Sequence, residues 1–108
     1  MIPKEIYEIH AGICRCLASP KRLEILDILR DRELSASEIA ERLSISGANA
    51  SQHLAMMKEK GILKCRRDGV SLYYSIAYPK VLKACEIMRE VLFEVLNERQ
   101  RLADKVRF

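Results

Sequence analysis

The chain has 108 residues, of which 49% are hydrophobic and 31% charged, and its formal net charge is +4. This length fits one small domain, spanning residues 1–108, with a modest core to which dimerisation would add buried apolar surface. No apolar run approaches the length of about eighteen residues that a membrane span needs, and the N-terminus has no signal-peptide pattern, so we exclude a membrane protein and expect a cytoplasmic one. The positive charge favours an anionic partner.

The first predicted element is a helix over residues 4–18. Ile2, Ile6, Ile9, Ile13 and Cys16 recur at helical spacing and form an apolar stripe. The stripe could cover the core of its own subunit, or it could pair with a second copy of the chain. We favour the second interpretation, because a small core needs only one side of a terminal helix.

Two short helices joined by a tight turn are predicted next. Ser35 and Glu38 match the serine-x-x-glutamate capping box at the start of the first helix, which ends near Leu43. Ser46 is expected to cap the second helix, which stops at Lys60-Gly61. Leu54, Met56 and Met57 are expected to form its buried side.

The second of these helices begins with small and polar side chains. Such a start can enter the major groove of duplex DNA, about 12 Å wide, without steric conflict. Its free amide groups also favour phosphate. The residues expected to contact DNA from this helix are Ser46, Gly47, Ala48, Asn49, Ser51, Gln52, His53 and Lys58.

A β-hairpin follows, with Asp68-Gly69 predicted as a type I′ turn. Pairing outward from that turn sets Arg66 opposite Ser71 and Cys65 opposite Leu72. Strand alternation then predicts one apolar face, formed by Leu63, Cys65, Leu72 and Tyr74, and one polar face, formed by Lys64, Arg66, Ser71 and Tyr73.

The hairpin and the helix before it are basic. Residues 58–67 contain five cations and one acid, whereas a merely solvated edge would be expected to mix both signs. Clustered cations beside a groove-reading helix are typical of a wing that contacts the DNA backbone. The expected wing contacts are Lys64, Arg66, Arg67 and Tyr73.

From Pro79 to about residue 105 the chain is predicted to be one long helix, with proline in its first turn. Apolar residues recur at spacings of four and three, which is a heptad seam. Together with the first helix, this seam is expected to form a dimer interface that includes Ile6, Ile9, Ile13, Cys85, Met88, Leu92 and Val95. The predicted fold is therefore mainly α with a small β-hairpin: a homodimeric winged helix-turn-helix of four helices, the hairpin and a fifth helix.

Residues 17–26 (LASPKRLEIL) resemble the L-x-x-P-x-R-L-x-I-L signature of ArsR/SmtB-type winged-helix repressors. The resemblance continues in order through ELSASEIA (33–40), SQHL (51–54), GIL (61–63), Gly69 and Tyr73-Tyr74, and it spans roughly residues 10–96. It implies a homodimeric transcriptional repressor that leaves its operator DNA when an effector binds.

The two metal sites best known in that family are not expected in this chain. One uses two cysteines in the segment where Ser35 and Ser37 stand here, and hydroxyls are poor ligands for soft metals. The other uses histidines and carboxylates on the last helix, whereas the sequence has no histidine after His53. For the His53 side chain, a role in hydrogen bonding or phosphate contact is favoured over metal ligation.

The cysteines leave a second effector chemistry open. Four cysteines with irregular spacing favour reduced thiols over a disulfide framework. His10 and Cys14 are four residues apart and share a helix face, and Cys85 lies in the heptad seam of the last helix. These three residues could form a thiol-directed site for a soft metal ion, an arsenical, or an oxidant or persulfide. The alternative is that the cysteines are small buried hydrophobes, as expected for Cys65.

Two classes of function fit these patterns. The first is a sequence-specific DNA-binding regulator that recognises a palindromic operator, and the second is a winged-helix module for protein association that has lost DNA binding. The basic wing and the polar helix start favour the first. An enzyme is not expected, because no nucleophile, base and orienting group share a motif, and no cofactor is firmly indicated.

Overall fold

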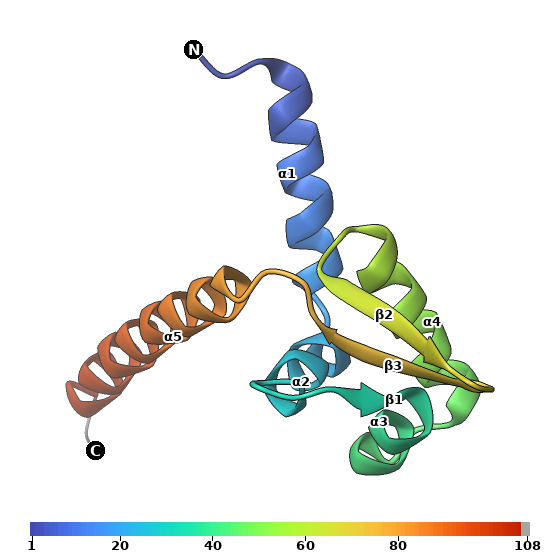
Figure 1. Cartoon of the computed structure of the whole chain (residues 1–108). Helices are drawn as coiled ribbons and strands as arrows, with labels where there is room; N and C mark the ends of the chain where they lie inside the picture. Colours follow the sequence, from blue (N-terminus) through green and yellow to red (C-terminus); the bar gives the residue numbers. More distant parts are fainter. Residues whose placement is uncertain (107–108) are drawn as a thin grey trace. The chain divides into compact units, whose positions relative to one another are not determined.

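The computed structural model describes residues 1–106 and divides into two compact units, Met1–Tyr78 and a second that begins at Pro79 (Figure 1). In order along the first unit, its elements are α1 (Lys4–Leu17), α2 (Pro20–Ile28), β1 (Leu34–Ser35), α3 (Ala36–Leu43), α4 (Gly47–Glu59), β2 (Leu63–Asp68) and β3 (Ser71–Ile76). The second unit contains the helix α5 (Lys80–Asp104). The elements confirm the predicted mainly helical fold with its hairpin.

Local capping signals fix both helices of the helix-turn-helix. The Ser35 hydroxyl accepts a hydrogen bond from the Glu38 amide, and the Glu38 carboxylate accepts one from the Ser35 amide, each at 3.1 Å. Ser44 ends α3 in a left-handed conformation (φ 54°), and Ser46 caps α4 by accepting from the Asn49 amide at 3.0 Å. These contacts confirm the predicted capping box and the predicted start of α4.

The core lies where α2, α3 and α4 pack against one another and α4 packs against β2. Its fully buried large side chains are Ile25, Leu26, Leu29, Ile39, Leu54 and Met57. Met56 is not among them: 39% of its surface is exposed, so the prediction that it belongs to the buried side of α4 is wrong. Met57 occupies the core position, and its neighbour is turned about 100° around the helix axis, toward solvent.

The sheet has three antiparallel strands in the order β1-β3-β2. The short strand β1 was not predicted; it pairs Leu34 with Tyr74 and Ser35 with Tyr73. A two-residue strand has no alternating pattern long enough to be recognised, and only its pairing with β3 defines it. Through β1, the residues just before α3 are attached to the wing.

The hairpin register differs from the predicted one by two residues. Arg66 lies opposite Tyr73, Cys65 opposite Tyr74 and Asp68 opposite Ser71, so the loop residues are Gly69 and Val70. Gly69 has a positive φ of 64° and Val70 does not, which is the pattern of a type II′ turn. An even shift keeps every side chain on its predicted face, so the apolar and polar faces are preserved.

The long helix α5 begins directly after Pro79, as predicted, and none of its described residues is buried. Many of its apolar side chains are exposed, including Met88 (66% exposed) and Phe93 (58% exposed). A helix with such a surface has not found its packing partner within its own unit.

Candidate nucleic-acid interface

The start of α4 presents a polar surface. Ser46, Gly47, Ala48, Asn49, Ser51 and Gln52 are all exposed, while Ala50, Leu54 and Met57 face the core. Lys58 is also exposed, toward the other end of the same helix. The arrangement leaves the first two turns of α4 free to approach a groove and keeps the helix anchored along its other side.

His53 differs from the other α4 residues because it is half-buried and already bonded. Its Nδ1 accepts a hydrogen bond from Nε of Arg22 at 3.2 Å, and Nη1 of Arg22 donates to the Cys16 carbonyl at 3.1 Å. Burial, followed by the positive charges of Arg22 and Lys21, lowers the pKa of His53. His53 thus has Arg22 as its hydrogen-bond partner, and its contact with DNA stays a prediction.

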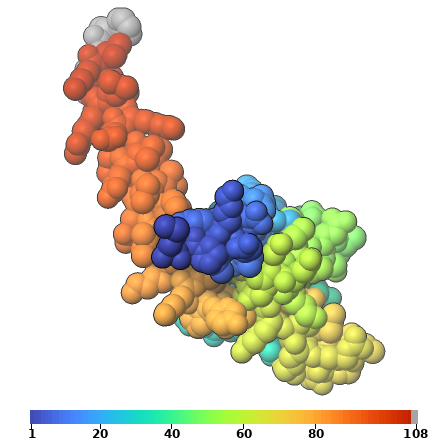
Figure 2. All heavy atoms as spheres, turned by 90° about the horizontal axis from the view of Figure 1, so that it is seen from above, coloured from blue at the N-terminus to red at the C-terminus, as the bar shows by residue number. Residues whose placement is uncertain are grey.

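The wing presents Lys64, Arg66 and Arg67 as exposed cations, with Tyr73 half-buried beside them. Figure 2 shows the hairpin, in yellow, projecting from the body of the first unit. Val70 at its tip is fully exposed. The hairpin thus has the shape and charge of a wing.

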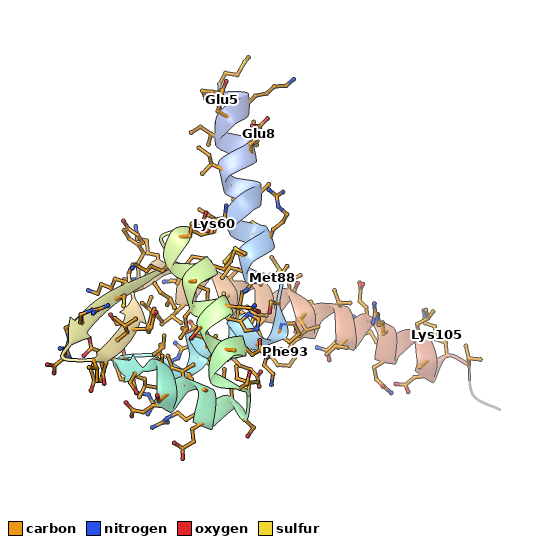
Figure 3. All side chains as sticks on the ribbon, turned by 90° about the vertical axis from the view of Figure 1, so that its right-hand side faces the viewer. Glu5, Glu8, Lys60, Met88, Phe93 and Lys105 are labelled. Carbon is orange, nitrogen blue, oxygen red and sulfur yellow. The ribbon has the colours of Figure 1, made fainter. Side chains whose placement is uncertain are left out.

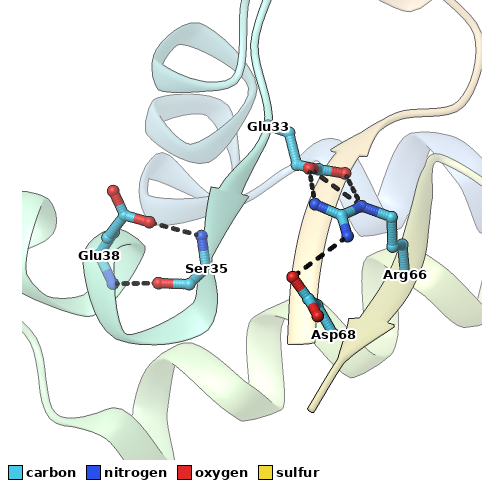
Figure 4. A network of polar contacts seen from close by, with 5 residues as sticks. All are labelled: Glu33, Ser35, Glu38, Arg66 and Asp68. Carbon is cyan, nitrogen blue, oxygen red and sulfur yellow. Dashed lines mark hydrogen bonds and ion pairs between the residues drawn. The ribbon is translucent and has the colours of Figure 1, made fainter. Parts of the chain in front are cut away.

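Arg66 has partners that the sequence did not indicate. Its guanidinium donates to both carboxylate oxygens of Glu33, with the shortest N–O distance 2.6 Å, and lies 3.8 Å from the Asp68 carboxylate (Figure 4). It also lies over the Tyr73 ring, 4.8 Å from the centroid. The hydrogen bond from Arg66 holds the pKa of the Glu33 carboxyl below its usual range. Glu33 is 33 residues away in sequence and directly precedes β1, which pairs with β3 of the wing.

The proposed effector residues belong to two different units. His10 and Cys14 are exposed on α1, and Cys85 is half-buried on α5, in the other unit. Within residues 1–106, no three histidine, cysteine or carboxylate side chains gather as metal ligands would. Cys65 is half-buried, and burial of the Tyr74 hydroxyl, followed by its interaction with Cys65, raises the pKa of that hydroxyl.

The predicted interface residues are mostly unburied in the single chain. Ile6, Ile9, Met88, Leu92 and Val95 are 39–66% exposed, whereas Ile13 and Cys85 are half-buried. Among the described helices, none is long and apolar enough to cross a membrane. Exposed apolar surface on this scale is typical of a protein interface.

Comparisons with known proteins agree with this geometry. A family described as a helix-turn-helix domain matches residues 17–66. The HTH-type transcriptional regulator Rv0081 of Mycobacterium tuberculosis is 32% identical over 108 residues, which cover 99% of this chain and 95% of the relative. Its crystal structure superposes with a TM-score of 0.79 at 33% identity, covering 90% of this chain and 98% of that one.

Two further relatives are similar to this chain over a smaller part of its length. The homodimeric winged helix-turn-helix domain Mb0332 of Mycobacterium bovis, a possible ArsR-family regulator, has a TM-score of 0.77 at 30% identity, with 87% of each chain covered. The transcriptional repressor SdpR of Bacillus subtilis is 33% identical over 65 residues, which are 60% of this chain and 72% of the relative.

Proposed function

The chain belongs to the ArsR/SmtB-type winged helix-turn-helix transcriptional regulators, and we propose that it is a homodimeric repressor that binds a palindromic operator. The observation that supports this most is the exposed polar start of α4 beside a basic, projecting hairpin. In this arrangement α4 enters the major groove, while the wing lies along the adjoining backbone.

Within the interface, the two elements have different tasks. Asn49, Ser51 and Gln52 are in a position to read or flank bases, since they project from the first turns of α4. Lys64 and Arg67 meet phosphates, together with Lys58, and set affinity for any duplex. Arg66 joins them only by giving up part of its contact with Glu33.

The apolar surface of the terminal helices supports the homodimer. In this proposal α1 and α5 of two chains pack together, so that residues 1–108 act as one domain and the exposed seam becomes buried. Two-fold symmetry then sets two copies of α4 about 34 Å apart, one turn of DNA. The related domain Mb0332 is itself homodimeric.

A selection from a pool of random DNA duplexes tests the proposal directly. We expect enrichment of a palindrome whose half-sites are centred about 10 base pairs apart. The variant Gln52→Ala should change the preferred bases, by about 1–3 kcal/mol per contacted pair, while keeping general affinity for DNA. If no duplex is enriched over the random pool, the alternative of a protein-association module takes the place of this proposal.

The proposal also includes a thiol site at which an effector binds and releases the protein from DNA. Its members are Cys14, Cys85 and His10. Cys14 is exposed and so accessible to soft metals, arsenicals and persulfides. Cys14→Ser and Cys85→Ser proteins should stay on DNA under an effector that releases the parent. If both variants leave DNA at the effector concentration that releases the parent, these cysteines are not the effector site.

A further inference from the structure

A concave site lies on the first unit, away from the start of α4. It is an open pocket of about 280 Å³ between the end of α1, the start of α2 and the end of α4. Figure 2 shows α1, in blue, beside the yellow-green end of α4. The residues lining the pocket are Gly12, Arg15, Cys16, Arg22, Met56 and Lys60.

Three of these six residues are cations, and none is an acid. A Cβ atom placed on Gly12 would lie 3.6 Å from Nζ of Lys60 and 3.8 Å from Nη2 of Arg15, so both charged ends converge on one point of α1. Neither side chain has an ion-pair partner within residues 1–106. Glu5 and Glu8 lie toward the opposite end of α1 from Lys60 (Figure 3).

The third cation is held rigidly. Arg22 is fixed by its bonds to the Cys16 carbonyl and to His53, both of which belong to neighbouring helices. A guanidinium positioned in this way has already lost its rotamer freedom, so binding an anion costs it little further ordering. The three positive charges therefore line one pocket, and an anion bound there would neutralise part of their charge.

The remaining wall of the pocket is apolar. Cys16 is 2% exposed, and burial raises the pKa of its thiol more than the neighbouring Arg22 and Lys60 lower it, so the sulfur is uncharged at neutral pH. Met56, exposed where a core position was expected, forms another part of this wall. A ligand here meets positive charge on one side and small apolar groups on the other.

We propose that this pocket binds a small oxyanion, a phosphate or sulfate group that is either free or carried by a small organic molecule. Arginine offers paired N–H donors that match tetrahedral oxyanions, and lysine adds a point charge. Bound there, the anion links α1 to the last turn of α4. The proposal is independent of whether α4 reads DNA.

A heteronuclear NMR titration of the protein, without DNA and at low ionic strength, tests the site. Inorganic phosphate, sulfate and glycerol phosphate are added in turn, with chloride at matched ionic strength as the blank. We expect saturable amide shifts centred on Gly12, Cys16 and Lys60. Tighter binding of the ester would identify an organic phosphate as the ligand, and equal binding would identify the oxyanion alone.

Matched variants separate a built site from general charge attraction. Arg15→Gln and Lys60→Gln should each weaken binding about tenfold, as expected for loss of one charge-assisted hydrogen bond. Lys4→Gln removes the same charge from the far end of α1 and should leave the affinity unchanged. Equal weakening by Lys4→Gln, or shifts that never saturate, would overturn the proposal.

Gly12 offers an independent check. Gly12→Asp should place a carboxylate between Arg15 and Lys60 and abolish anion binding. Gly12→Ala brings only a Cβ at ordinary contact distance and should keep it. If Gly12→Asp binds phosphate as the parent does, the anion does not lie beside Gly12, where Arg15 and Lys60 converge.

Discussion

Arg66 shows how one side chain can belong to both the fold and the proposed interface. It extends from the polar face of the wing, where a phosphate contact is expected, yet its guanidinium binds Glu33 and covers the Tyr73 ring. Both partners of the ion pair are partly exposed, with 54% of the Arg66 side chain and 34% of the Glu33 side chain accessible. An ion pair of this kind stabilises a fold little, so its main effect is to occupy Arg66.

Replacing Glu33 should therefore strengthen DNA binding. In Glu33→Gln, Arg66 is released and a negative charge is removed beside the wing, so affinity for duplex DNA should rise and the salt slope should steepen by about one unit. The melting temperature should change little. Fluorescence anisotropy at several salt concentrations measures both quantities.

Glu41→Gln is the matched control, since it removes an equal charge from an exposed site on α3. It should not alter the salt slope. An unchanged slope in Glu33→Gln would show that Arg66 does not reach DNA even when it is released from this carboxylate.

His53 should make stability depend on pH. Its pKa lies below the ordinary value of 6.5, mainly because burial disfavours the charged ring. As pH falls, the unfolded chain takes up the proton first. The stabilisation is therefore complete above the ordinary value and is lost as pH falls through 6.5 toward the lowered value.

Urea unfolding between about pH 7 and pH 5 measures this effect, because it covers the range in which histidine titrates. His53→Gln keeps an acceptor for Arg22 but cannot titrate, so its unfolding free energy should fall less with pH than the parent's. His10→Gln, on an exposed site, should behave as the parent does. Parallel curves for parent and His53→Gln would contradict the assignment.

At the scale of elements, features encoded within three or four residues were predictable from the sequence. The capping box of α3 and the Ser46 cap of α4 depend on contacts three residues apart, and the structure has both. The hairpin turn was misplaced because Asp-Gly is a strong local signal, while pairing along the strands selects Gly69-Val70 instead. Strand β1 and the Glu33–Arg66 contact depend on residues far apart in sequence, which no local pattern encodes.

The capping box allows a prediction about α3. Ser35→Ala removes the acceptor for the Glu38 amide and should destabilise the first unit by about 1 kcal/mol. For a unit of this size, that corresponds to a fall of roughly 4–8 °C in melting temperature. Ser37→Ala changes a neighbouring exposed serine within α3 and should have a much smaller effect. Melting temperatures are measured by circular dichroism. An equal fall in melting temperature for both variants would show that the Ser35 cap does not stabilise α3.

At the scale of the whole molecule, the first unit has its own buried core, whereas none of the second unit's residues up to 106 is buried. A helix of 25 residues with no fully buried side chain gains little from packing, and packing provides most helical stability in proteins. The seam therefore needs a partner, and the sequence pattern identified its residues correctly as apolar without determining what covers them. A second copy of the chain fits best, because α1 also exposes Ile6 and Ile9.

Leu92→Glu tests this assembly. Leu92 is 50% exposed in the single chain, so a glutamate there is readily solvated in a monomer, whereas in the proposed dimer it would enter an apolar seam at a high desolvation cost. Sedimentation should show the parent as a dimer and Leu92→Glu as a monomer or unfolded chain, with helical content by circular dichroism distinguishing the two. Asn97→Glu adds the same charge at a polar position of α5 and should remain dimeric. A folded Leu92→Glu dimer would place the interface elsewhere, and the spacing of the two α4 helices would then have to follow from a different symmetric contact.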